Sequence, residues 1–384
     1  MPPRHLLVRP DADQLGHEAE EPPRAVRRDD ADARTALPER NLDVLRAVAV
    51  SCVLTDHVGL LFRPTGGVLL QLTQIGDAGV MLFFVHTALV LMASLERQGR
   101  GRAWIRTFYI RRVFRIYPLA IATVLLVVLA GVPRAIPAIG VHAAPTAHPL
   151  RQVVANLALV QNLFGIDDVL GPLWTLPVEM DMYLLLPLCF LVARRGTRDM
   201  LFLFVAIVAA HFVVHTQALP GAWRLSVFES GPCFFGGVLA YHLLRTRARP
   251  IAPAWTLGPA LLAAVAVRPL FPSAFLPDVV HWLPCILLGV TIPFIAELAP
   301  SMITRAGHSV ATYSYGIYLL HFPVFWLAFD VGRTLPLALQ ATIAIIGLIL
   351  VPFAAYHLIE APGIRIGRNV AHRPLTLAAT QPAP

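Results

Sequence analysis

The chain has 384 residues, of which 57% are hydrophobic and 14% are charged, and its mean hydropathy is +0.65. This composition excludes an ordinary soluble globular protein and predicts an all-α, polytopic membrane protein. All 31 basic residues are Arg and the formal net charge is +8. We interpret them as loop charges of a membrane protein and expect no nucleic-acid partner, because no basic–aromatic patch accompanies them.

Residues 1–40 contain no apolar run and many charged residues, which predicts a disordered cytoplasmic tail. One membrane domain is predicted for 41–368, and a second disordered tail for 369–384. The four cysteines lie in apolar runs without metal-ligand spacing, so we interpret them as buried hydrophobic residues. We expect no metal site and no permanently bound cofactor.

Ten apolar runs are long enough to predict membrane-spanning helices. A further run, Val153–Phe164, is too short to span and is interpreted as re-entrant or interfacial. The ten predicted helices cover 42–62, 78–95, 117–132, 172–193, 199–215, 227–244, 254–269, 278–297, 310–330 and 336–358.

The distribution of Arg between alternate loops predicts the orientation of these helices. With the N-terminus inside, the inner loops contain 17 Arg and the outer loops 6, as expected from the excess of positive charge on cytoplasmic loops. We therefore expect a plasma-membrane protein with both termini in the cytoplasm.

The first run contains Arg46 and His57, eleven positions apart. A helix turns about 100° per residue, so both side chains share one face and stand about 16 Å apart along the axis. Ionisable groups inside a membrane span are costly and mark functional sites. Alone, the pair is compatible with a proton relay as well as with the handling of a long anionic ligand.

Arg111, Arg112 and Arg115 end an Arg-rich inner loop and lead into the third helix. Arg112 and Arg115 share a helix face, and Arg111 lies one turn before Arg115. Several guanidinium groups at the cytoplasmic surface suit phosphate groups. Anchoring to lipid headgroups is the alternative.

Polar residues also interrupt the second and fourth runs. Gly76 and Gly79 permit a close approach of another helix, and His86 either lines a cavity or bonds to a neighbouring helix. Glu179 and Asp181 begin the fourth helix, where a carboxylate needs a partner or solvent. Glu179 is a candidate partner for His57 or Arg46, or a ligand for substrate hydroxyls.

The aromatic and titratable residues of the later runs can each be interpreted in two ways. Trp174 and Tyr183 are either interfacial belt residues or a platform for a sugar ring. Tyr318 and His321 are three apart on one face of the ninth helix, as are His357 and Glu360 at the end of the tenth; pairing with another helix is at least as good an explanation for them as catalysis.

Six motifs in order resemble the integral-membrane acyltransferase 3 family, whose members acylate hydroxyls of surface polysaccharides and secreted small molecules. The resemblance covers Asn41 to about Arg368. The matching segments are Arg46-x10-His57, Gly76 to Val85, Arg111 to Pro118, Leu173 to Glu179, Ser314 to His321 and Tyr356 to Pro362.

The resemblance implies an acyl-CoA donor, with acetyl-CoA as the default, arriving from the cytoplasm and an acceptor hydroxyl, often on a sugar, at the outer side. It implies that His57 is the catalytic histidine with Arg46 as its motif partner, that Arg112 and Arg115 meet the CoA phosphates, and that Glu179 is the family's acidic residue.

We expect His57 to act as general base on the acceptor hydroxyl, with Arg111 beside the other two arginines at the donor. The acceptor side is expected to include Trp174, Tyr183, His321, Asp181 and His86. The alternative function is a transporter or flippase for an anionic or glycosylated amphiphile, with Arg residues along its path. The sequence shows no internal repeat to favour it.

Overall fold

The computed structural model describes residues 37–62, 75–98, 103–135, 147–215, 227–246, 249–270 and 277–372. In these segments the regular elements are helices, and one isolated bridge joins Ala252 and Ile295. The chain is an all-α, polytopic membrane protein, as predicted. Most residues of the two predicted tails lie outside the described residues, and the described part contains the last few residues of the N-terminal tail and the first few of the C-terminal tail.

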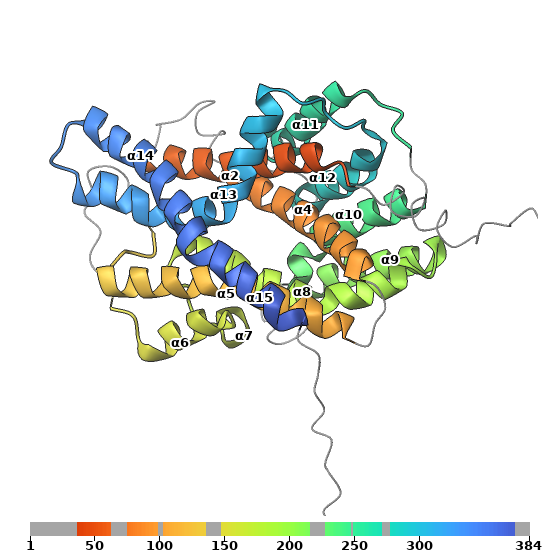
Figure 1. Cartoon of the computed structure of the whole chain (residues 1–384), viewed down its shortest axis with the longest axis horizontal. Helices are drawn as coiled ribbons and strands as arrows, with labels where there is room; N and C mark the ends of the chain where they lie inside the picture. Colours follow the sequence, from red (N-terminus) through yellow and green to blue (C-terminus); the bar gives the residue numbers. More distant parts are fainter. Residues whose placement is uncertain are drawn as a thin grey trace, which may run out of the picture. The chain divides into compact units, whose positions relative to one another are not determined.

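Each of the ten predicted runs contains a helix (Figure 1). The elements are α2 (Glu39–Phe62), α4 (Ile75–Gln98), α5 (Trp104–Ala130), α6 (Leu150–Ala158), α7 (Gln161–Phe164), η1 (Gly171–Trp174), α8 (Thr175–Ala193), α9 (Thr197–His215), α10 (Val227–Arg245), η3 (Ala254–Thr256), α11 (Leu257–Leu270), α12 (Pro277–Thr291), η4 (Ile292–Phe294), α13 (Met302–Phe325), η5 (Trp326–Val331), α14 (Leu337–Ala355), η6 (Tyr356–Glu360) and α15 (Ala361–His372).

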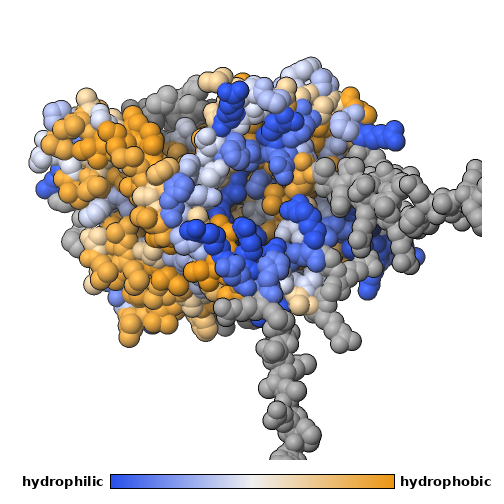
Figure 2. Space-filling view, viewed as in Figure 1, coloured by the Kyte–Doolittle hydropathy of each residue, from blue (hydrophilic) through white to orange (hydrophobic). Residues whose placement is uncertain are grey.

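Six helical stretches of the described chain are long and apolar enough to cross a membrane, namely α2, α4, α5, η1 with α8, α9, and α14 with η6 and α15. The apolar helices α11 and α12 are shorter. In α4, 72% of the most apolar window is buried, against 17% in α9 and α14. Helix α4 is therefore central, and α9 and α14 are peripheral. Apolar side chains gather over α14 and α5 in Figure 2.

Glycines let α2 and α10 pack closely against α4, as predicted for Gly79. A Cβ atom on Gly79 would lie 2.5 Å from the carbonyl oxygen of Ala49 on α2. A Cβ on Gly237 of α10 would lie 2.2 Å from the carbonyl oxygen of Val85. Such close contacts fix the lateral position of α2, which carries Arg46 and His57.

Helix α5 begins at Trp104, thirteen residues before the predicted start, and it continues through Pro118. The predicted Arg-rich loop is therefore helical from Trp104 onward. Hydropathy marks only the apolar part of a helix, and no Gly or Pro stands between Trp104 and Tyr117 to end it. Helix α15 crosses α5 where Gly363 and Gly367 face Phe114. The short run Val153–Phe164 forms most of α6 and all of α7, neither of which is long enough to span a membrane.

Candidate active site

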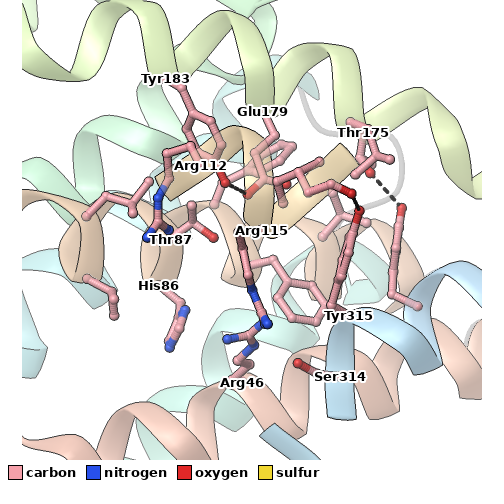
Figure 3. A pocket seen from close by; sticks show the side chains of 18 residues that line it. Arg46, His86, Thr87, Arg112, Arg115, Thr175, Glu179, Tyr183, Ser314 and Tyr315 are labelled. Carbon is pink, nitrogen blue, oxygen red and sulfur yellow. Dashed lines mark hydrogen bonds between the residues drawn. The ribbon is translucent and has the colours of Figure 1, made fainter. Parts of the chain in front are cut away.

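A cavity of about 110 Å³, here called the arginine cavity, opens among side chains of α2, α4, α5, α8 and α13 (Figure 3). Four separate segments of sequence supply the polar side chains that were predicted to form the site. Those that line it are Arg46, His86, Arg112, Arg115, Glu179 and Tyr183.

Two of the three arginines have buried nitrogens that are not hydrogen-bonded. Arg115 Nη1 lies 2.7 Å from Oε2 of Glu360, a fully buried carboxylate in the π-helical turn η6. The buried Nε atoms of Arg46 and Arg112 have no hydrogen-bond partner among the described residues. Figure 3 shows the side chains of Arg46 and Arg115 extending toward each other from α2 and α5. The cavity therefore presents donors that a ligand oxygen can satisfy.

Glu179 lies on α8 and accepts a short hydrogen bond from the hydroxyl of Tyr183, one turn further along the helix. It is the one carboxylate among the residues that line the cavity, against three arginines. Of the two predicted partners for Glu179, the structure brings it into the cavity of Arg46 and not into that of His57. The excess of positive charge suits an anionic ligand such as a phosphate.

A second cavity of about 210 Å³, the histidine cavity, is lined by His57, Asp56, Asp77 and Trp174. Val80 and Tyr318 line both this cavity and the arginine cavity. The two cavities are therefore neighbours along the shared face of α2, with Arg46 in one and His57 in the other. The Tyr318 hydroxyl donates to the carbonyl of Pro172 at 3.1 Å and accepts from Thr175 at 3.0 Å.

The side-chain partner of His57 is another histidine, and the ring of His57 also bonds to the backbone of Val53. Nδ1 of His57 and Nε2 of His321 are 3.0 Å apart. Nδ1 of His321 lies 2.7 Å from the carbonyl oxygen of Tyr318 and 3.2 Å from that of Ile317. A carbonyl only accepts, so Nδ1 of His321 carries its proton and Nε2 of the neutral ring is an acceptor.

This arrangement assigns the tautomer of His57. Since Nε2 of His321 accepts, Nδ1 of His57 must donate, and Nε2 of His57 keeps a lone pair. The ring of Phe322 meets that of His57 edge-on at 4.8 Å between centroids. A histidine held in one tautomer and one orientation is prepared to accept a proton from a ligand hydroxyl.

Two predicted site residues lie elsewhere. Arg111 contacts Nε2 of His372 on α15 at 3.1 Å, and Asp181 accepts a hydrogen bond from Asn162 at 2.8 Å. Neither lines the two cavities described above. The side chain of Glu360, for which pairing with another helix was one of two explanations, pairs with Arg115 of α5.

Sequence reasoning missed the pairing of His57 with His321, although both lay in quoted motifs. A carboxylate was the expected partner, and nothing in the spacing of two residues 264 apart indicates contact. Among the described residues, no group of three His, Cys, Asp or Glu could hold a metal ion.

The helices of this polytopic protein thus bring a cavity with three arginines next to a cavity lined by the half-buried His57. The family model described as an acyltransferase domain, acyltransferase 3, matches residues 39–357. The chain belongs to this family, and the matched region contains the residues that line both cavities.

Three curated proteins illustrate the similarity. The chain is 30% identical to the acyltransferase MdmB of Streptomyces mycarofaciens over 182 residues, covering 45% of this chain and 42% of MdmB. It is 22% identical to the peptidoglycan O-acetyltransferase OatA of Listeria monocytogenes, covering 84% and 55% of the two chains. Nodulation protein 10 of Rhizobium leguminosarum is 25% identical, covering 88% and 96%.

The match spans about half the length of the first two relatives. No solved structure matches significantly.

Proposed function

We propose that the chain is an O-acyltransferase that moves an acyl group, acetyl in the default case, from acyl-CoA to a hydroxyl of a carbohydrate acceptor. The observation that carries the proposal is the adjacency of a cavity with three arginines and a cavity with a histidine held as a base. Family membership and a relative named as a peptidoglycan O-acetyltransferase support it.

The donor would occupy the arginine cavity. Arg46 and Arg112 have unpaired buried nitrogens, so their guanidinium groups can bind CoA phosphates, while Arg115 is already paired with Glu360. The acyl end would extend past Val80 and Tyr318 toward His57. The orientation from the distribution of Arg places this donor on the cytoplasmic side of a plasma membrane, with both termini inside.

The acceptor hydroxyl would donate its hydrogen bond to Nε2 of His57. As the oxygen attacks the thioester carbonyl, its proton moves to this nitrogen, the C–O bond forms and the C–S bond breaks. The CoA thiolate leaves and takes up the proton from His57. No covalent enzyme intermediate is required, because the thiolate is a good leaving group. A positioned general base contributes about 10²- to 10⁴-fold to the rate.

The test uses the purified full chain in lipid nanodiscs with labelled acetyl-CoA and tri-N-acetylchitotriose, and it measures acetylated product by mass spectrometry. His57→Gln is expected to lower the transfer rate by about 10²- to 10⁴-fold. His308→Gln, at an exposed position on α13 paired with Asp43, is the matched control and should leave the rate unchanged. Transfer by His57→Gln at the wild-type rate would refute the assignment. Transport is measured separately with the chain in lipid vesicles, where movement of the acceptor across the membrane without acetylation would favour the transporter.

The donor site has its own test. Arg46→Ala and Arg112→Ala are each expected to raise the KM for acetyl-CoA about tenfold or more, the loss expected for one charge-assisted contact to phosphate. Arg249→Ala, an exposed Arg outside both cavities, is the control. An unchanged KM in both cavity variants would remove the arginine cavity from donor binding.

A further inference from the structure

A third cavity lies beside Trp174, between α7, the segment after it, the start of α8 and the start of α10. It has a volume of about 370 Å³ and is here called the acidic cavity. The proposed donor and base do not use it. Its polar lining includes Gln161, Asn162, Asp168 and Glu229.

Two amide oxygens in this lining are buried and have no hydrogen-bond partner among the described residues. Gln161 is 2% exposed and donates through Nε2 to Oδ1 of Asp168 at 3.0 Å. Asn162 donates through Nδ2 to Oδ2 of Asp181 at 2.8 Å. Turning either amide over would place its oxygen against a carboxylate oxygen, so both oxygens are fixed as acceptors. An unsatisfied buried acceptor is unfavourable and calls for a donor.

The charges around these oxygens favour the same kind of ligand. Asp167, Asp168 and Glu229 line the cavity, and no basic residue does. Arg134 pairs with Asp167 at 2.8 Å and lies 3.9 Å from Asp168. Burial raises the pKa of Asp168, so this carboxyl group gains from a ligand hydroxyl that donates to it. The lining accepts hydrogen bonds and repels anions.

Trp174 connects this cavity with the base. Its indole lines both the acidic cavity and the histidine cavity and is 39% exposed. An exposed indole offers an apolar face to a ring with a polar edge. A ligand that covers it can reach the acidic cavity at one end and His57 at the other.

We infer that the acidic cavity is a subsite for a neutral sugar unit next to the one that is acylated, so that the acceptor is an oligosaccharide or glycoside with free hydroxyls. This inference rests on the proposed function for the identity of the reaction. The subsite itself rests on the buried amide oxygens, the carboxylates and the shared indole.

Binding is measured without donor, so that its outcome does not depend on acyl transfer. Purified full chain is titrated with neutral trisaccharides, tri-N-acetylchitotriose and maltotriose, with the matching monosaccharides and with trigalacturonate, and tryptophan fluorescence and isothermal calorimetry report the Kd. At least one neutral trisaccharide is expected to bind at least tenfold more tightly than its monosaccharide and than trigalacturonate.

Two variants locate the binding. Trp174→Leu and Glu229→Gln are each expected to raise the Kd of that trisaccharide fivefold or more. Trp255→Leu, at a 70% exposed Trp on η3 that lines none of the three cavities, is the matched control and should change nothing. In the transfer assay, Trp174→Leu should also abolish the preference for trisaccharide over monosaccharide.

Failure of the subsite and failure of the proposed function give different results. Equal binding of trisaccharide and monosaccharide, tighter binding of trigalacturonate, or an unchanged Kd in both variants overturns the subsite. Absence of His57-dependent transfer together with Trp174-dependent trisaccharide binding overturns the acyltransferase proposal and leaves the subsite standing.

Discussion

Replacement of His321 tests the tautomer assignment at the base. His321→Leu removes the acceptor that lies 3.0 Å from Nδ1 of His57. His321→Gln offers an amide oxygen at about the same reach and can still accept from that nitrogen. Phe322, whose ring meets that of His57 edge-on, is unchanged in both variants, so the base should keep its place while its preference for one tautomer weakens in the Leu variant.

The magnitude follows from this single hydrogen bond. A bond between neutral groups stabilises by about 0.5–1.5 kcal/mol net, which corresponds to about a 2- to 12-fold change in the ratio of the two neutral tautomers of His57. We expect kcat of His321→Leu to fall by up to this factor at an unchanged KM for acetyl-CoA, and His321→Gln to recover most of the loss.

The assay is the steady-state transfer of labelled acetyl from acetyl-CoA in nanodiscs, with circular dichroism to confirm that the variants are folded. A His321→Leu variant with wild-type kcat would refute a positioning role. A fall as large as that of His57→Gln, not recovered in His321→Gln, would instead make His321 the base. A merely structural role predicts parallel losses of folded protein in both His321 variants.

Two further predictions concern stability and are read from thermal unfolding in detergent. Gly79→Ala should lower the free energy of unfolding by about 1–3 kcal/mol, because its Cβ would lie 2.5 Å from a carbonyl oxygen of α2. Gly258→Ala is the control and should raise the free energy of unfolding by up to about 1 kcal/mol, because a Cβ there has nothing within 4 Å. Equal effects of the two substitutions would contradict the close packing. Glu360→Leu should lower the free energy of unfolding by about 3–5 kcal/mol, because Arg115 would lose its buried partner. Glu297→Leu breaks an exposed ion pair with Arg40 and should lower the free energy of unfolding by less than about 1 kcal/mol. A loss this small for Glu360→Leu would show that the pair of Glu360 with Arg115 is solvated.

The positions of the apolar helices could be predicted from the sequence, but not their lengths or the start of α5. Each of the ten apolar runs contains a helix, yet only six helical stretches of the described chain are long and apolar enough to cross a membrane. Helix α5 continues over the polar stretch Trp104–Tyr117, and hydropathy cannot separate a polar helical extension from a loop. The same limit applies to α15, whose polar residues follow the apolar run of α14 without a break in the helix.

The residue types of the site were predictable, because charges at membrane depth are rare and costly. Which of these residues lie together in the fold could be predicted only in part. Helical periodicity put Arg46 and His57 on one face, yet it could not show that Glu360 neutralises Arg115 or that His321 accepts from His57. These contacts depend on how distant helices pack, and that is decided by close approaches such as the one at Gly79.

The two ends of the proposed reaction path differ in charge in a way that separates the substrates. The arginine cavity has three cations and one carboxylate in its lining, whereas the acidic cavity has three carboxylates and no cation. An anionic donor is therefore attracted to one end and repelled from the other.

In the proposed mechanism the reacting groups meet where Val80 and Tyr318 line both the arginine cavity and the histidine cavity. The Tyr318 hydroxyl donates to the Pro172 carbonyl and accepts from Thr175, so its one proton is already used in a hydrogen bond. Nε2 of His57, which the hydrogen bond to His321 leaves as an acceptor, would then receive the proton of the acceptor hydroxyl.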